Sequence, residues 1–252
     1  MIDCVLMDLD GTTMTKDNLV PDNLSSLIRK RDQMHWIMVT GRSFASATRT
    51  PLAKLFSKET PHIFDGGATV MSLDGVPIHQ RYLSPVEIDV FINSINTEDL
   101  EYIYSCVGTV GGICWMRASY TNPELHIVKR TNDLAEYGSW IKSENVSKIS
   151  VRKKNDFLLP DAINHFSNGT NIDITTASVD KGSGAKFIFE MLGIDPRKSI
   201  FLFNDKNDLP IINNIFFADV IKIKVGDSMP DIAADHNPSH PSDVAELLQK
   251  FI

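Results

Sequence analysis

Short apolar runs alternate with amphipathic segments through the first 65 residues of the chain. The runs predict strands over residues 5–7, 36–39 and 61–64, and helices are predicted between them over 21–32 and 43–56. A proline at the start of the first helix suits its first turn, and one inside the second is expected to kink it. This alternation is typical of a parallel sheet covered by helices.

The pattern changes after this point and becomes rich in strands. Asp74-Gly75 lies between two apolar runs and predicts a hairpin over 68–80. Helices are then predicted over 85–95, 133–141 and 158–166, and strands over 102–106, 113–117, 124–128, 146–152 and 172–176. Residues 82–177 are therefore predicted to form an α+β insert with a mainly antiparallel sheet.

Strand–helix alternation resumes at Lys181. A helix is predicted to end at Gly193, a common stop signal, and strands follow over 199–203 and 220–225. Further helices are predicted over 209–213 and 244–251. The predicted fold is α/β, with a Rossmann-like core of residues 1–81 and 178–252 and an inserted α+β domain of residues 82–177.

Polar residues follow several of the predicted core strands. Asp8, Thr40, Asp65 and Asn204 each stand where a strand ends. In open parallel sheets, ligands bind at the carboxyl ends of the strands. The sequence therefore predicts a polar site at this edge of the sheet.

Asp8 and Asp10 are the most informative of these polar residues. Strand alternation points both carboxylates to the same side, where each opposes the ionisation of the other. A bound Mg²⁺ would relieve this repulsion, because it is a hard cation that takes oxygen ligands. Alone, however, an Asp-x-Asp sequence is more often a strand ending in a polar turn, so the interpretation depends on distant residues.

Composition narrows the possible functions only a little. Hydrophobic residues make up 42% and charged residues 23% of the 252 residues, as in an ordinary globular protein. The formal net charge of −7 disfavours non-specific nucleic-acid binding, although one small anionic ligand remains compatible with it.

The cysteines and the apolar runs bear on location. The three cysteines are far apart and lack metal-ligand spacing, which favours a reducing compartment. We expect no signal peptide, because the N-terminus enters a strand at once. No apolar run reaches the ~18 residues of a membrane span. A cytoplasmic protein without a membrane partner is expected, and the oligomeric state is left open.

Four motifs resemble those of the haloacid dehalogenase superfamily of phosphohydrolases. The match is to the Cof-type branch, class IIB, whose α/β cap is inserted after the third strand. The motifs are Asp8-Leu9-Asp10-Gly11-Thr12, Val39-Thr40-Gly41-Arg42, Lys181 within Val179-Asp180-Lys181-Gly182, and Asn204-Asp205-Lys206-Asn207-Asp208-Leu209-Pro210. They span nearly the whole chain, and the hairpin after Gly66-Gly67-Ala68 matches the entry to that cap.

The resemblance implies a role for each matching residue. Asp8 would be the nucleophile that forms an aspartyl-phosphate, and Asp10 would be the acid/base. Thr40 and Lys181 would bind the substrate phosphate. Mg²⁺ would be the cofactor, held by Asp8, the backbone carbonyl of Asp10 and Asn204. Without the other motifs, Thr40 would more often be a polar strand-end cap and Lys181 a surface charge.

The chain departs from the family pattern in two places. Asn204 and Phe203 stand where the family has Asp and Gly, so one anionic metal ligand is replaced by a neutral amide. Asp205 is an alternative metal ligand, and Asp208 is expected to orient the site without binding the metal directly. Gly66 replaces an Asn that often contacts the substrate or its loop.

The sequence therefore predicts a Mg²⁺-dependent phosphatase of the haloacid dehalogenase superfamily. Its substrate is expected to be a small phosphorylated metabolite, with a sugar phosphate favoured. Two alternatives stay open at this point: a phosphate-ligand binding protein with degenerate catalysis, and a phosphomutase or phosphotransferase. The insert would exclude water and select the leaving group, with Trp115, Arg117, Tyr120 and His126 as candidate contacts.

Overall fold

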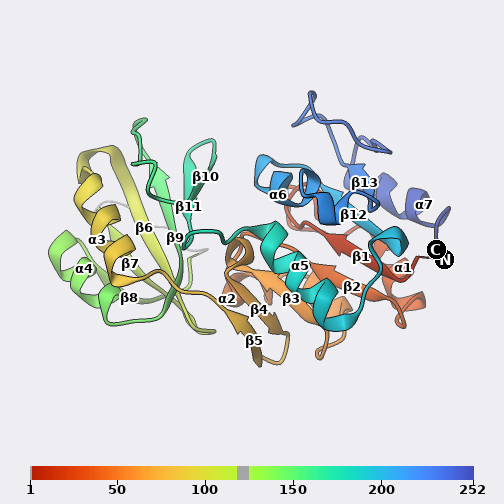
Figure 1. The fold of residues 1–252 in the computed structure, drawn as a ribbon, viewed down its shortest axis with the longest axis horizontal. Helices are drawn as coiled ribbons and strands as arrows, with labels where there is room; N and C mark the ends of the chain where they lie inside the picture. The colour runs from red at the N-terminus through yellow and green to blue at the C-terminus, as the bar shows by residue number, and fades with distance from the viewer. Residues whose placement is uncertain (1, 118–124) are drawn as a thin grey trace.

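A computed structural model describes residues 2–117 and 125–252 of the protein. Figure 1 shows two lobes joined by two chain segments, with the N- and C-termini together at the far end of one of them. We call the lobe that carries the termini the core, and the other lobe the cap. None of the helices in the described residues combines the length and apolar character needed to cross a bilayer.

The core is built on a parallel sheet with the strand order β13-β12-β1-β2. These strands are β1 (Cys4–Met7), β2 (His35–Met38), β12 (Ser199–Phe203) and β13 (Ile221–Lys224). A bridge from Val39 to Ile63 joins β2 to an antiparallel extension. That extension consists of β3 (Pro61–Phe64), β4 (Thr69–Ser72) and β5 (Pro77–Gln80).

The central strand β1 is buried on both faces, which explains its continuous apolar run. Val5 and Met7 belong to the hydrophobic cluster that holds α1 (Asp22–Lys30) and α7 (Val244–Leu248). Cys4 and Leu6 belong to the cluster that holds α5 (Lys181–Leu192). Helices therefore cover both faces, and the polar residues that follow the strands are left at the edge facing the cap.

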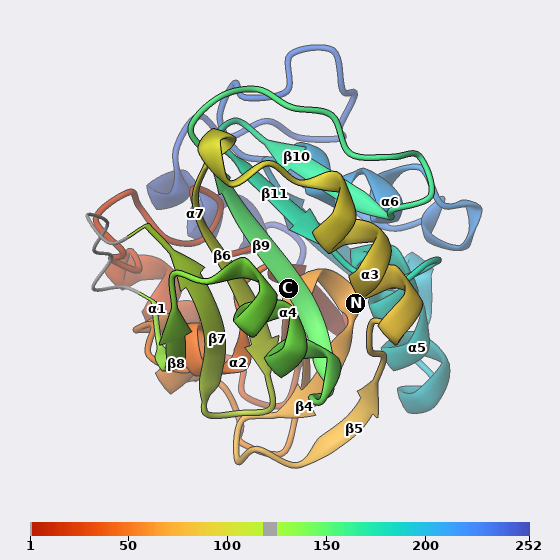
Figure 2. The ribbon, with the colours of Figure 1, turned by 90° about the vertical axis from the view of Figure 1, so that its left-hand side faces the viewer.

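The cap contains a six-stranded sheet with the order β10-β11-β9-β6-β7-β8. Its strands are β6 (Leu100–Val107), β7 (Gly111–Met116), β8 (Ile127–Thr131), β9 (Val146–Lys153), β10 (His165–Asn168) and β11 (Asn171–Ile174). Neighbours are antiparallel except β7 and β8, which run parallel. Helices α3 (Pro85–Ser94) and α4 (Leu134–Lys142) lie over the outer face of the sheet (Figure 2). The opposite face is turned toward the core.

Three predicted elements need correction. The helix predicted over 158–166 is wrong: Pro160 accepts from the N–H of Ile163 in a tight turn, and β10 begins at His165. The helix predicted over 43–56 is broken at Pro51 into α2 (Phe44–Ala47) and a 3₁₀ turn (Leu52–Leu55), because proline cannot continue the hydrogen-bond ladder. The strand predicted over 124–128 is found later in the chain, as β8. Residue 124, the first of the predicted strand, lies outside the described part of the chain.

The remaining elements of the C-terminal half agree with the predictions within a few residues. Helix α5 ends at Gly193, which has a left-handed conformation. The short helix α6 (Leu209–Ile212) follows β12. Because β12 returns to the centre of the sheet beside β1, segments nearly 200 positions apart in the sequence meet at one edge.

Candidate active site

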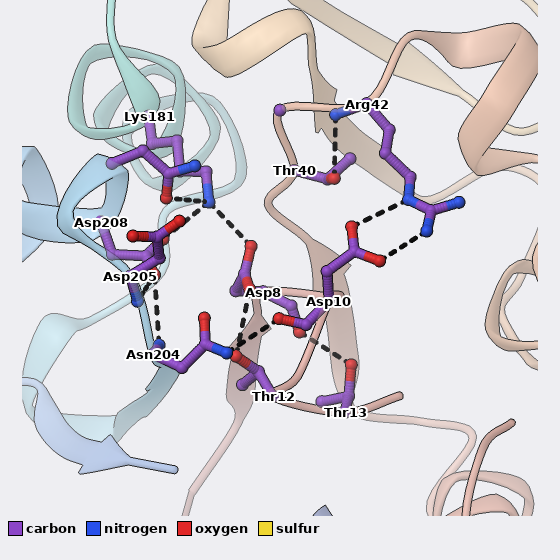
Figure 3. Close-up of polar contacts among 12 residues, drawn as sticks. Asp8, Asp10, Thr12, Thr13, Thr40, Arg42, Lys181, Asn204, Asp205 and Asp208 are labelled. Carbon is purple, nitrogen blue, oxygen red and sulfur yellow. Dashed lines mark hydrogen bonds and ion pairs between the residues drawn. The ribbon is translucent and has the colours of Figure 1, made fainter. Parts of the chain in front are cut away.

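Polar side chains from both halves of the core meet at the carboxyl end of the sheet (Figure 3). They follow β1, β2 and β12, and one begins α5. A cavity of about 310 Å³ opens between this edge and the cap. The core residues that line it include Asp8, Asp10, Thr40, Asn204 and Asp205. The predicted site residues are therefore brought together, with Lys181 and Asp208 directly behind them.

Asp8 is held in one orientation by two donors. It follows β1 directly and is only 6% exposed. Its Oδ1 accepts from Lys181 Nζ at 2.7 Å, and its Oδ2 accepts from the Thr12 hydroxyl at 3.0 Å. Gly11 turns the chain after Asp10 with a φ of +76°, a conformation that favours glycine. The turn brings Thr12 back to the carboxylate.

Lys181 is a buried ammonium surrounded by acceptors. It is 1% exposed and donates to Asp8 Oδ1 and Asp208 Oδ1 at 2.7 Å each, and to Asn207 Oδ1 at 2.9 Å. Burial opposes its charge, but the Asp208 and Asp8 carboxylates outweigh burial and raise the pKa of Lys181 above its usual value. Lys181 therefore stays cationic, and all three of its protons are in hydrogen bonds.

The charge balance around Asp8 is negative. Burial raises the pKa of the Asp8 carboxyl well above its ordinary value, and Lys181 only partly offsets this effect. The nearby Asp208 and Asp10 add to the rise, because like charges oppose ionisation. One ammonium thus serves two buried carboxylates, and a further cation at the pocket would stabilise the ionised form of Asp8.

Asp10 turns its side chain away from Asp8 and toward Arg42. Arg42 Nε donates to Asp10 Oδ2 at 2.8 Å, and Nη2 of the same guanidinium contacts Oδ1. Arg42 also reaches Asn18 Oδ1 at 2.9 Å. The Asp10 side chain is 57% exposed, so it stays accessible from the cavity. The sequence assigned no role to Arg42, whereas the structure shows that it orients Asp10; its place in the Thr-Gly-Arg motif was the available signal.

Thr40 presents its hydroxyl to the same cavity. It is 1% exposed, and its backbone N–H bonds to Ile63 O in the adjoining strand. Its Oγ accepts from the Arg42 N–H at 3.0 Å. Because that contact uses a lone pair, the hydroxyl proton is left to donate to an anionic group in the pocket.

Asn204 and Asp10 meet through the backbone. Asn204 Nδ2 donates to the Asp10 carbonyl at 2.8 Å. The approach needs Gly11, since a Cβ there would lie 2.5 Å from Asn204 Nδ2. The Asn204 amide thus lies against the Asp10 carbonyl, which the family resemblance implies as a ligand of Mg²⁺.

Asp208 is buried behind the loop, whereas Asp205 reaches the cavity. Asp208 is fully buried and accepts from Lys181 through Oδ1 and from the N–H groups of Asn204 and Asp205 through Oδ2. Asp205 lines the cavity, and its Oδ1 accepts from the Lys206 N–H. Asp208 therefore shapes the loop from behind, while Asp205 remains at the pocket.

The oxygen donors at the pocket fit a hard cation such as Mg²⁺. Among residues 2–117 and 125–252, no three His, Cys, Asp or Glu side chains form a ready metal cage. The donors are instead mixed: the Asp8 carboxylate, the Asp10 carbonyl, the Asn204 amide and the Asp205 carboxylate. Mg²⁺ commonly takes one or two carboxylates and keeps several waters, which suits this set.

Asp65 does not share the pocket, although it also ends a strand. It is 3% exposed and accepts from Thr69 Oγ1 at 3.0 Å and from Ser147 Oγ of the cap at 2.8 Å. It thereby links the two lobes. Gly66 adopts a φ of +66° and faces only Thr175 at 3.9 Å, so the left-handed conformation explains a small residue there.

The four cap residues suggested by the sequence have different positions. Trp115 is buried on the helix-covered side of the cap, and its indole N–H donates to Asn132 O. Arg117 donates to the carbonyls of Leu100, Thr97 and Glu98. His126 does line the cavity, and Tyr120 lies outside the described residues.

Apart from His126, the cap residues that line the pocket were not among the candidates from the sequence. They include Lys148, Ser150 and Asp173, which alternate with apolar residues along β9 and β11. Alternation marks them as facing away from the cap helices. This signal was available in the sequence, but it does not say which polar face meets the core.

Comparison with known proteins agrees with this fold. Residues 5–218 match a family model described as haloacid dehalogenase-like hydrolase. One similar solved structure is a haloacid dehalogenase-like hydrolase from Bacteroides thetaiotaomicron, 18% identical, with a TM-score of 0.80 and 100% of both chains covered. Another is a subclass IIB sugar phosphatase, 14% identical, with a TM-score of 0.76 over 99% of this chain and 98% of that chain.

A third similar solved structure is that of a protein from Thermotoga maritima, which is 17% identical, with a TM-score of 0.78 over 100% of this chain and 98% of that chain. No curated protein matches. At these identities the solved structures establish the fold, and the family model establishes the family. The predicted resemblance and the predicted fold class are confirmed: the chain belongs to the haloacid dehalogenase-like hydrolases.

Proposed function

We propose that the protein is a Mg²⁺-dependent phosphomonoesterase that acts through an aspartyl-phosphate. The observation that carries this proposal is the buried pair of Asp8 and Lys181 beside the accessible carboxylate of Asp10. A carboxylate held by an ammonium at the floor of a cavity suits nucleophilic attack on phosphorus. A second carboxylate within the same loop supplies the proton transfers that a phosphatase needs.

In the first half-reaction, a carboxylate oxygen of Asp8 attacks phosphorus. The bond between phosphorus and the leaving oxygen breaks, and Asp10, which enters this step protonated, gives its proton to that oxygen and becomes a carboxylate. Thr40 donates its hydroxyl to a phosphoryl oxygen, and Lys181 balances charge on Asp8 and on the phosphoryl group. Arg42 holds Asp10 on the cavity side, so its carboxyl stays within reach of the leaving group.

In the second half-reaction, Asp10 accepts a proton from water. The water oxygen attacks phosphorus, the bond to Asp8 breaks, and inorganic phosphate is released with the Asp8 carboxylate restored. Asp8, the Asp10 carbonyl and Asn204 are proposed to hold Mg²⁺, with Asp205 as the alternative to Asn204. When bound, the ion neutralises charge on the transferred phosphoryl group.

The cap is proposed to close the site and to contact the leaving group. Residues 1–81 with 178–252 would form the catalytic domain, and residues 82–177 the cap. A cavity of about 310 Å³ lined mostly by polar and charged residues suits a small phosphorylated metabolite, and a sugar phosphate is favoured. A sugar phosphatase among the structural neighbours supports this choice. The cytoplasmic location stays a prediction.

Hydrolysis of para-nitrophenyl phosphate and a panel of small phosphate esters, with and without Mg²⁺, tests the proposal. The wild-type protein should release phosphate only with Mg²⁺, and Asp8→Asn should abolish release because an amide cannot attack phosphorus. Thermal unfolding of both proteins serves as the folding control. Phosphate release by Asp8→Asn, or release by the wild type that does not depend on Mg²⁺, would refute the proposed function.

A phosphate-ligand binding protein is the second candidate, favoured by one observation. The neutral Asn204 stands where the family has an anionic metal ligand, which weakens the case for metal-dependent turnover. Thermal stabilisation by phosphate esters without any phosphate release would favour binding alone.

A further inference from the structure

The cap turns a polar sheet face toward the catalytic edge of the core. On β6, β9 and β11, alternate residues pack beneath α3 and α4, among them Ile103, Ile149 and Ile172. The intervening residues therefore face the cavity; the ones that line it are Tyr102, Tyr104, Cys106, Lys148, Ser150, Asn171 and Asp173. Any leaving group attached to a phosphate in the site must lie against this face.

One charged pair lies at the centre of the polar face. Lys148 Nζ donates to Asp173 Oδ2 at 3.1 Å, and Ser150 Oγ donates to Asp173 Oδ1 at 2.5 Å. Asp173 and Ser150 are register partners on β11 and β9, so the sheet itself fixes this geometry. The side chain of Lys148 is 6% exposed and that of Asp173 is 30% exposed. Both residues line the cavity, and the carboxylate is the more exposed member of the pair.

The same pair reaches the loop predicted to bind phosphate. Lys148 Nζ donates to the Gly41 carbonyl at 2.5 Å. A Cβ on Gly41 would lie 3.4 Å from Asp173 Oδ2, so the carboxylate is close to this backbone. Gly41 stands between Thr40 and Arg42. Asp173 is thus close to the expected position of the substrate atoms that are attached directly to the phosphate.

The charges of the pair cancel within the cap. Burial opposes the charge of Lys148, but the carboxylates of Asp173 and Asp65 outweigh it, so the pKa of Lys148 lies above its usual value. Lys148 is the only lysine or arginine that the cap contributes to the described lining of the cavity. Its charge is already matched by Asp173, so a second anionic group on the substrate meets no uncommitted cation there.

A purely structural role for the pair would explain the Lys148 contacts but not the exposure of Asp173. Each carboxylate oxygen has two lone pairs, and each accepts one hydrogen bond from the neighbours described above. Because Asp173 lines the cavity and its side chain is 30% exposed, its carboxylate can accept further hydrogen bonds there. Hydroxyl groups donate to such acceptors, whereas carboxylate and phosphate groups are repelled by them.

We propose that Asp173, held by Lys148 and Ser150, is a specificity-determining residue that accepts hydrogen bonds from hydroxyl groups of the leaving group and disfavours a second anion. The inference rests on the proposed phosphatase activity. It assigns the choice of a neutral, hydroxylated leaving group to one carboxylate of the cap.

A matched pair of substrates tests this assignment. Glucose 6-phosphate and cyclohexylmethyl phosphate share a six-membered ring and a phosphorylated methylene, but only the first carries hydroxyl groups. The wild-type kcat/KM should be at least tenfold higher for glucose 6-phosphate than for either cyclohexylmethyl phosphate or 6-phosphogluconate. In Asp173→Asn both ratios should fall at least fivefold. Ser150→Ala, which keeps the Lys148 contact, should shift the ratios in the same direction by a smaller factor.

Glu101→Gln is the matched control, because it removes a cap carboxylate paired with Arg152 that does not line the cavity. It should leave both ratios unchanged. A wild-type protein that shows no preference within the matched pair would overturn the inference, and so would equal losses on all three substrates in Asp173→Asn and Ser150→Ala. Absence of any hydrolysis, including that of para-nitrophenyl phosphate, would instead refute the proposed function.

Discussion

At the scale of single residues, the charge balance of the site is set by two cationic side chains that pair with three carboxylates. Lys181 is shared by Asp8 and Asp208, while Asp10 is paired separately with Arg42. The neutral Asn204 leaves the cluster less negative than a carboxylate at that position would. Metal affinity and stability without metal are therefore expected to respond to Asn204 in opposite directions.

Asn204→Asp is predicted to bind Mg²⁺ more tightly and to be less stable without it. The new carboxylate adds a charged oxygen ligand, but it loses the amide donor to the Asp10 carbonyl. The Mg²⁺ concentration for half-maximal phosphate release should fall about tenfold or more, equivalent to about 1.4 kcal/mol. The thermal shift caused by Mg²⁺ should increase.

Asp205→Asn is the comparison that locates the ligand. If Asn204 holds the metal, this variant should keep the wild-type Mg²⁺ requirement within about threefold. A sharply raised requirement in Asp205→Asn, together with an unchanged one in Asn204→Asp, would move the metal to Asp205.

At the scale of elements, apolar patterning predicted every core strand and most helices. Runs such as Trp36-Ile37-Met38-Val39 are decisive because both faces of the parallel sheet are buried. The segment 158–166 misled the prediction, since its apolar residues have near-helical spacing. Leu158 is in fact 93% exposed while Leu159 and Ile163 are buried, and Pro160 shapes the turn between them. Local spacing does not reveal that outcome, because the cap packing decides it.

His62, on β3, makes the free energy of unfolding of the protein dependent on pH. Its Nδ1 accepts from the Met38 N–H of β2, and the ring is fully buried. Burial lowers the pKa of His62 to about 3, from an unfolded value near 6.5. Because the folded pKa lies below the unfolded one, this contribution is present above pH 6.5 and is lost as the pH falls toward 3.

Chemical denaturation at several pH values measures the effect. The free energy of unfolding should fall by about 2 kcal/mol more in the wild type than in His62→Gln between pH 7 and pH 5. The Gln amide oxygen can still accept from Met38 N without titrating. Parallel pH profiles for the two proteins would contradict the assignment to His62.

At the scale of the whole molecule, the sequence located the core side of the pocket but not the cap side. Asp8, Thr40 and Asn204 could be predicted to meet because parallel strands end at one edge. Asp173 and Lys148 could not, since their place depends on how the cap sheet docks on the core. Trp115 illustrates the same limit: the sequence made it a candidate contact for the leaving group, yet its side of β7 faces the cap helices.

Gly67, which follows β3, packs against Asp180, where the chain returns from the cap to the core. A Cβ there would lie 1.9 Å from Asp180 O, and the residue has a φ of +110°. Gly67→Ala should therefore lower the free energy of unfolding by about 3 kcal/mol through overpacking and backbone strain. It should also reduce phosphate release, because Asp180 precedes Lys181.

Gly66→Ala is the matched control for Gly67→Ala. It also requires a positive φ, but its new Cβ meets only Thr175 at 3.9 Å. The expected loss is about 1–2 kcal/mol, which is the backbone part alone. Equal losses in the two variants, measured by denaturant unfolding, would show that the contact with Asp180 is unimportant.

The central position of β1 also constrains how the chain reaches its folded state during synthesis. Cys4 pairs with His35 on one side and with Ser199 on the other. At about 5–20 residues per second, the ribosome needs about 10–40 s to pass from the first strand to that second neighbour. The whole cap is made in this interval, so it can fold while β1 is still unpaired on the side that β12 will occupy. Asp8 is thus synthesised well before Asn204, so the two sides of the site can meet only after the cap and β12 have been made.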